Sequence, residues 1–185
     1  MLKLFLLNLI KEETMMERPG IVTMKGNPLT LLGPELKVGE AAPDFEVIDN
    51  NLSPVRFSSF HGKICLIASV PSLDTPVCDI ETRRFNTEAG KLSPEINILT
   101  ISMDLPFAQK RWCGAAGVDK VITLSDHKEA SFGMAYGVLI KELRLLARAI
   151  FVVDRQGIIR HIQIVKDLTE EPDYDQVIGL VKTLA

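Results

Sequence analysis

The sequence predicts an α/β protein with a mixed central β-sheet that is flanked by helices. Strand-like and helix-like segments alternate from residue 64 onward, which is typical of this class. Residues 64–70 are apolar without alternation, as in a strand that is covered on both faces. The turn sequence at residues 154–157 lies between two β-type runs and predicts an antiparallel hairpin, which makes the sheet mixed.

The N-terminal part of the chain is predicted to hold an extension and then small β-structures. Residues 1–18 form the extension, and one domain spans residues 19–185. The apolar patch at residues 4–10 faintly resembles a secretory signal, but it is short and has no cleavage site. We therefore favour an extension that is mobile or docked on a partner, with Met15 and Met16 as later start codons. Residues 20–32 predict an N-terminal β-hairpin, and short strands are expected at residues 46–49 and 55–57.

The remaining elements follow the order of a thioredoxin-like fold. Strands are predicted at residues 64–70, 96–103, 120–124, 149–153 and 158–165. Helices are predicted at residues 79–90, 107–113 and 129–136 and after Pro172, where apolar residues share one helix face. In the second helix, Asp104 is the expected cap and Gly114 the expected end.

Bulk composition excludes several classes of protein. The 185 residues suffice for one domain with a full core but are short for two. A net charge of −3 without a basic stripe argues against a nucleic-acid partner. The longest apolar run is far below the ~18 residues of a spanning helix, so we expect no membrane partner.

The three cysteines, Cys65, Cys78 and Cys113, are too few and too widely spaced for a disulfide-stapled scaffold. The chain has no Cys-x-x-Cys, and its histidines lack metal-type spacing, so we expect no structural zinc site. This usage favours a cytoplasmic protein with one or two reactive thiols. Cys65 lies within an apolar strand and is assigned to the core, together with Phe45, Phe57, Phe85, Phe132 and Phe151.

Cys78 is the strongest candidate for a nucleophile. It follows a loop that two prolines restrict, Pro71 and Pro76, and it lies where a helix begins. Unpaired backbone N–H groups at a helix start favour the thiolate. The alternative, a buried small hydrophobic residue, fits the polar neighbours of Cys78 poorly. Thr75 is either a helix cap or turn residue, or a hydroxyl that contacts the Cys78 sulfur and the substrate, and the residues alone leave both open.

The pattern of Pro71, Thr75 and Cys78, Pro-x-x-x-Thr-x-x-Cys, resembles the active-site motif of the peroxiredoxins. Other strings are similar to the bacterial thiol peroxidase (Tpx) subfamily, namely residues 25–28, 74–78, 83–86, 102–109, 111–114, 148–154 and 170–174. The resemblance covers about residues 19–185 and leaves only the extension outside it.

The resemblance implies that the chain reduces hydrogen peroxide or small alkyl hydroperoxides by an atypical two-cysteine mechanism. Cys78 would be the peroxidatic residue and Cys113 the resolving one, and thioredoxin would reduce the resulting intramolecular disulfide. Arg148 would be the active-site arginine that favours the thiolate, and Pro71 would shield the sulfur from water. In such a mechanism no metal, haem, flavin or other cofactor is needed, because both redox equivalents reside on sulfur. The family usually forms homodimers.

Two other functions remain open at this point. The same cysteine pair would serve a redox sensor that passes oxidation to a client protein instead of turning over peroxide. A thiol-disulfide oxidoreductase acting on proteins is disfavoured because the chain lacks Cys-x-x-Cys. In the peroxidase, local unwinding is expected to precede the disulfide, because both cysteines lie in predicted helices.

Overall fold

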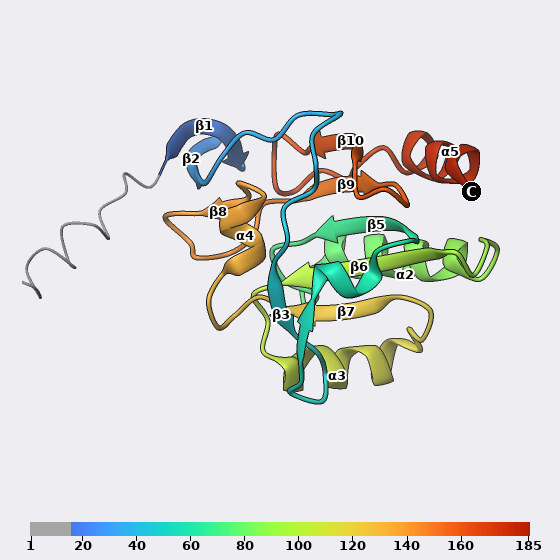
Figure 1. Cartoon of the computed structure of the whole chain (residues 1–185). Coiled ribbons are helices and arrows are strands. Elements are labelled where there is room, and N and C mark those ends of the chain that lie inside the picture. The colour runs from blue at the N-terminus through green and yellow to red at the C-terminus, as the bar shows by residue number, and fades with distance from the viewer. Residues whose placement is uncertain (1–15) are drawn as a thin grey trace, which may run out of the picture.

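The structure is a computed structural model that describes residues 16–185 (Figure 1). Most of the expected extension, residues 1–15, lies outside the described residues. The first strand begins at Glu17, two residues before the expected start of the domain. The elements in chain order are β1 (Glu17–Met24), β2 (Asn27–Leu32), β3 (Glu46–Ile48), β4 (Pro54–Arg56), η1 (Phe57–Phe60), β5 (Ile64–Ser69), α2 (Pro76–Ala89), β6 (Ile96–Ser102), α3 (Pro106–Ala116), β7 (Ile122–Ser125), α4 (Ser131–Ala135), β8 (Leu139–Ile140), β9 (Ala149–Val153), β10 (Ile159–Ile164) and α5 (Tyr174–Leu184).

Seven strands form the central sheet, in the order β10-β9-β5-β6-β7-β3-β4. β5, β6 and β7 are parallel, while β9 and β3 join them antiparallel on either side. All six residues of β5 are buried, as expected for an apolar strand inside a sheet that is covered on both faces. The predicted mixed sheet of an α/β fold is confirmed.

Side chains of β5 alternate between two cores, one on each face of the sheet. Cys65 and Ile67 enter the first core, which also contains the aromatic group Phe45, Phe57, Phe132, Tyr136 and Phe151. Leu66 and Ala68 enter the second core, which α2 and α5 cover with Phe85, Val177, Ile178 and Val181. The six residues that the sequence assigned to the interior, Cys65 and the five phenylalanines, are therefore all buried.

A second, small sheet has the order β1-β2-β8 and packs on the first core. The antiparallel pairing of β1 with β2 confirms the predicted N-terminal hairpin. β8 was not predicted from the sequence. It has only two residues, which pair with Leu31 and Leu32 of β2.

The sheet register gathers several segments at one edge. Ser69, the last residue of β5, pairs with Ile101 near the end of β6 and with Ala149 at the start of β9. The loop after β5, the loop after β6 and the residue that precedes β9 therefore lie together, although they are far apart in sequence. This edge carries the candidate site.

The expected ends of the second helix are wrong. Leu105, not Asp104, is the N-terminal cap residue of α3, and the helix continues through Gly114 to Ala116. Gly117 ends it with a left-handed backbone, φ 65°, which glycine adopts without a Cβ clash. The carboxylate of Asp104 does not cap because residues of another loop occupy it. The helix α2 also begins earlier than expected, at Pro76, because proline is well suited to the first position of a helix.

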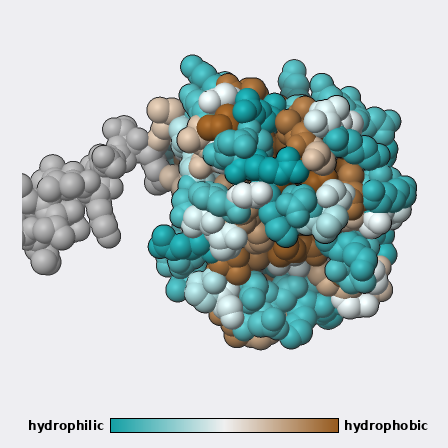
Figure 2. All heavy atoms as spheres, turned by 45° about the vertical axis from the view of Figure 1, so that its right-hand side comes forward, coloured by the Kyte–Doolittle hydropathy of each residue, from teal (hydrophilic) through white to brown (hydrophobic). Residues whose placement is uncertain are grey.

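The surface is largely hydrophilic, and apolar patches lie between the polar areas on the face that Figure 2 shows. Among the described residues, the most exposed large apolar side chain is that of Phe107, in the first turn of α3. Within residues 16–185, no helix combines the length and apolarity that crossing a membrane requires.

Candidate active site

Cys78 lies in the first turn of α2, at the sheet edge where β5 ends. The preceding loop contains the buried Pro71, and Thr75 occupies the N-terminal cap position. The first backbone bond of the helix runs from the N–H of Asp79 to the carbonyl of Thr75. The N–H groups of Val77 and Cys78 precede that bond and carry the positive end of the helix dipole. The local backbone therefore favours an anion at Cys78.

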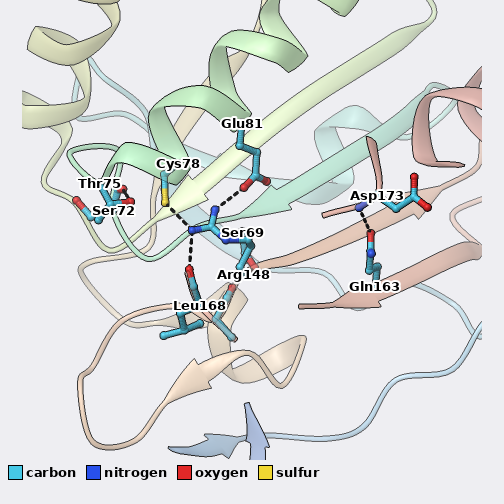
Figure 3. A network of polar contacts seen from close by, with 10 residues as sticks. Ser69, Ser72, Thr75, Cys78, Glu81, Arg148, Gln163, Leu168 and Asp173 are labelled. Atoms are coloured by element: carbon cyan, nitrogen blue, oxygen red, sulfur yellow. Dashed lines mark hydrogen bonds and ion pairs between the residues drawn. The ribbon is translucent and has the colours of Figure 1, made fainter. Parts of the chain in front are cut away.

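Arg148 brings a buried positive charge to Cys78 from a distant part of the chain (Figure 3). Its Nη2 donates to the Cys78 Sγ at 3.4 Å and to the carbonyl oxygen of Leu168 at 2.9 Å. Its Nη1 donates to Glu81 Oε2 at 2.5 Å. Because Ala149 pairs with Ser69, the register of β9 against β5 places residue 148 at the edge from which the Cys78 loop departs.

Glu81 shares Arg148 with Cys78. Both charged side chains are almost completely buried, with 0% and 1% of the Glu81 and Arg148 side chains exposed. Burial raises the pKa of Glu81 to about 7, although the charge and the hydrogen bond of Arg148 oppose that shift. For Arg148, burial alone lowers the pKa, but the charges of Cys78 and Glu81 and their hydrogen bonds outweigh it and raise the pKa above its ordinary value. The guanidinium thus stays charged beside the sulfur.

Thr75 does not cap the helix through its side chain. Its hydroxyl instead donates to the carbonyl oxygen of Ser72 at 3.0 Å, and no side-chain bond closes the N-terminus of α2 within the described residues. Thr75 therefore occupies the cap position and bonds back into the preceding turn, in line with the cap or turn interpretation, and contact of its hydroxyl with the substrate stays a prediction.

A hollow of about 240 Å³ opens beside these groups. Its lining is almost wholly apolar and includes Pro71, Thr75 and Arg148, with Leu145 and Leu168 among the apolar side chains. Cys78 itself is fully buried and borders the hollow through Arg148 and its helix neighbours Pro76 and Val77. A small apolar molecule with one polar end fits such a space, the polar end reaching Arg148 and Thr75.

Cys113 lies in α3 and is half-buried. Its Sγ lies 3.3 Å from the hydroxyl of Thr123, which also accepts a hydrogen bond from Asn50 Nδ2 at 2.8 Å. All three cysteines lie in the described part of the chain, and all three are free thiols. The neighbouring Trp112 packs against the small apolar cluster of Val70, Leu73 and Cys78. In the structure, α3 therefore contacts the Cys78 cluster through Trp112, whereas the Cys113 sulfur contacts Thr123.

The site contains residues that were not singled out from the sequence. Glu81 had a local signal, since it lies three residues after Cys78 and therefore on the same helix face. The carbonyl of Leu168 had none, because a backbone acceptor carries no mark in the sequence. Asp104 was seen as a helix cap, and its contacts to Ser72 and Leu73 were not foreseen.

Comparison with known proteins gives concordant results. The Redoxin family profile matches residues 37–178. The thiol peroxidase of Bacillus subtilis (strain 168) is 53% identical over 163 residues, covering 88% of this chain and 97% of the relative. The thiol peroxidase of Oceanobacillus iheyensis is 56% identical over 158 residues, covering 85% and 96%. Among solved structures, a peroxiredoxin-like protein from Aquifex aeolicus superposes with a TM-score of 0.85 at 41% identity, covering 91% of this chain and 99% of that one.

Proposed function

This chain belongs to the redoxin family, as a peroxidase that works through a thiol, and from that premise we propose that Cys78 is the residue that reduces the peroxide. The observation that carries the proposal is the bond of 3.4 Å between Arg148 Nη2 and the Cys78 Sγ beside an apolar hollow. Of the three cysteines, all of them described, Cys78 alone contacts a buried cation. Burial raises the pKa of Cys65 to about 11, which keeps that thiol protonated.

In the first step, the Cys78 thiolate attacks the terminal oxygen of the hydroperoxide. The S–O bond forms as the O–O bond breaks, and the hydroperoxide proton passes to the departing alkoxide, which leaves as alcohol or, from hydrogen peroxide, as water. Sulfur loses two electrons and becomes a sulfenate, which takes up a proton from solvent to give the sulfenic acid. Arg148 donates to the peroxide oxygens and offsets the charge that moves onto the leaving oxygen. The Thr75 hydroxyl orients the O–O bond, and the buried Pro71 keeps water from the sulfur.

In the second step, the Cys113 thiol gives up its proton and its sulfur attacks the sulfenic sulfur. The departing hydroxide takes up that proton and leaves as water, so that a Cys78–Cys113 disulfide forms. A dithiol protein of the thioredoxin type then reduces this disulfide by exchange. Cys113 must first leave the hydroxyl of Thr123, and part of α2 or α3 must unwind. We expect the enzyme to act as a homodimer, as the family resemblance implies, and in the cytoplasm, as its few cysteines indicate.

The test is peroxide consumption coupled to thioredoxin, thioredoxin reductase and NADPH. Cys78→Ser should abolish consumption, while Cys113→Ser should react once per chain and lose turnover. Cys65→Ser is the matched control and should retain full turnover. Peptide mapping without reductant, after one equivalent of peroxide, should show a Cys78–Cys113 linkage.

Three results would contradict the proposal. Substantial turnover in Cys78→Ser would remove that residue from the first step. A linkage of Cys78 to Cys65 would remove Cys113 from the second. Consumption of one equivalent without thioredoxin-driven turnover by the wild type would indicate a redox sensor rather than a peroxidase.

A further inference from the structure

The carboxylate of Asp104 joins segments that carry the two cysteines. Asp104 lies between the end of β6 and the start of α3, and its Oδ1 accepts from the Ser72 hydroxyl at 2.7 Å. Its Oδ2 accepts from the Leu73 backbone N–H and from the Ser102 hydroxyl, both at 2.8 Å. Hydrogen bonds to an ionised carboxylate are stronger than those between neutral groups. Three donors therefore hold this side chain, and two of them belong to the loop that leads to Cys78.

On the loop side, the residues that Asp104 holds are those that place Thr75 and Cys78. The carbonyl of Ser72 accepts from both the backbone N–H and the hydroxyl of Thr75, at 3.1 and 3.0 Å. Figure 3 shows Ser72 beside Thr75 at the start of the helix that carries Cys78. Leu73 packs against Cys78 in the apolar cluster that Trp112 covers. Movement of Ser72 and Leu73 would therefore displace the Thr75 hydroxyl and one apolar wall of Cys78.

On the other side, the same carboxylate is linked to the helix that carries Cys113. The Ser102 hydroxyl, which donates to Asp104, accepts from Gln109 Nε2 at 3.0 Å. Gln109 is fully buried, donates also to the carbonyl of Leu124, and lies one helical turn before Cys113. The backbone carbonyl of Asp104 accepts from the Ser125 hydroxyl at 2.5 Å. A continuous set of bonds thus runs from the Cys78 loop to α3.

We propose that Asp104 is a positioning residue that holds both cysteine segments in the arrangement in which peroxide reacts, and that its bonds to Ser72 and Leu73 must break before the disulfide forms. The inference rests on the proposed function, because it takes Cys113 as the partner of Cys78. Asp104 touches neither substrate nor sulfur. The same bonds that favour the first step by fixing Thr75 slow the second step by opposing the opening of the loop.

The inference requires the two steps to respond in opposite directions. In Asp104→Ala, we expect the rate constant for oxidation by peroxide to fall by about tenfold and the rate constant for disulfide formation to rise by about tenfold, since about that factor corresponds to one bond to a charged group. Ser72→Ala removes one of the three donors, and it should shift both rates in the same directions by a smaller factor. A merely structural role would slow both steps or neither.

The experiment is stopped-flow fluorescence of the reduced full-length protein mixed with excess hydrogen peroxide. Trp112 is the sole tryptophan of the chain and lies between Cys113 and the Cys78 cluster, so it reports both steps. Oxidation gives a phase whose rate rises with peroxide concentration, and disulfide formation gives a phase whose rate does not. Rapid quenching with a sulfenic-acid reagent and mass spectrometry assigns the two phases independently of fluorescence.

Asp154→Ala is the matched control. Like that of Asp104, the Asp154 carboxylate stabilises a turn, because it accepts hydrogen bonds from the backbone N–H groups of Gln156 and Ile158. It follows Val153, which pairs with Cys65 near the start of β5, and so lies at the opposite edge of the sheet from Cys78. This variant should lose stability while leaving both rate constants unchanged.

The outcomes separate this inference from the proposed function. If Cys113→Ser loses the second phase while Asp104→Ala leaves both rates as in Asp154→Ala, the positioning role is overturned and the proposed function stands. If Cys113→Ser keeps the second phase, the proposed function itself fails. If Asp104→Ala does not fold, Ser72→Ala and Asp104→Asn decide, and equal or parallel changes of the two rates in those variants overturn the inference.

Discussion

Replacement of Glu81 by glutamine should remove a pH dependence of stability that the buried carboxylate causes. The Glu81 side chain is fully buried, and its Oε1 has no hydrogen-bond partner among the described residues. Its other oxygen binds Arg148 at 2.5 Å. Burial raises the pKa of Glu81 from 4.5 to about 7, because desolvation penalises the charged form by more than the attraction of Arg148 repays.

The sign and size of the effect follow from linkage. Because the pKa of Glu81 is higher in the folded state than in the unfolded state, folding favours the protonated carboxyl. This contribution to the free energy of unfolding is fully present below pH 4.5 and is lost as the pH rises through about 7. The shift from 4.5 to about 7, multiplied by about 1.4 kcal/mol for each pH unit, gives a loss on the order of 3 kcal/mol. A glutamine does not titrate and removes this term.

Urea unfolding at pH 5, 6, 7 and 8 measures the effect, with Cys78→Ser as the shared background so that thiol titration does not contribute. Relative to that background, the Glu81→Gln variant should gain about 3 kcal/mol of stability on going from low to high pH. Glu88→Gln on the same helix is the control. Lys91 donates to the half-buried Glu88 and lowers the pKa of its carboxyl, so the effect of Glu88→Gln should be small and of the opposite sign.

Two results would refute this reasoning. A difference between Glu81→Gln and its background that does not change with pH would mean that Glu81 has the same pKa in both states. A difference that increasingly favours the glutamate as the pH rises would mean that Arg148 outweighs burial and that the carboxyl is ionised in the folded protein.

Three further predictions concern other parts of the molecule. Burial raises the pKa of Cys65 to about 11, so about one Cys65 thiol in a thousand is ionised at pH 8. Iodoacetamide should therefore label the half-buried Cys113 far faster than Cys65, as mass spectrometry would show. Equal labelling rates of the two cysteines would contradict this. Gly137→Ala should destabilise the fold by about 3 kcal/mol in urea unfolding, because Gly137 has φ 65° and a Cβ would run into the Pro34 carbonyl; an unchanged midpoint would be inconsistent with that clash. Thr123→Val removes the hydroxyl that contacts the Cys113 sulfur. In stopped flow, disulfide formation should be about threefold faster than in the wild type, as expected for the loss of one neutral hydrogen bond. Slower disulfide formation than in the wild type would argue against a restraining role of Thr123.

The parts of the fold that the sequence predicted are those with a local signal. A few consecutive residues suffice to predict β5, from its unbroken apolar run, and the hairpin of β9 and β10, from the turn between them. β8 has two residues and is a strand only through its pairing with Leu31 and Leu32 of β2, so its own sequence does not predict it. Asp104 and Gly114 have the local chemistry of a helix cap and a helix stop. Contacts with another loop engage the Asp104 carboxylate, and the helix continues through the exposed Gly114 until Gly117, whose left-handed backbone ends it.

In the candidate site too, the residues that the sequence predicts are those with a local signal. Pro71, Thr75 and Cys78 lie within eight consecutive residues, so their proximity follows from the chain itself. Arg148 could be placed only through family resemblance, because its position depends on the pairing of Ser69 with Ala149, and sequence patterns do not specify a register between distant strands. Lys141 and Arg144, the cations that precede it in sequence, are exposed, and nothing in the local sequence distinguishes Arg148 from them.

Arg148 couples the titration of Glu81 to the chemistry of Cys78. A single guanidinium, buried between two acidic groups, balances one negative charge, and a second anion in the same desolvated space is unfavourable. An ionised Cys78 therefore favours a protonated Glu81, whereas oxidation of the sulfur removes that anion and allows Glu81 to ionise. It follows that reduced wild-type protein should lose stability over a higher pH range than the Cys78→Ser background, and coincident pH profiles would show that the sulfur and the carboxyl bind the guanidinium independently.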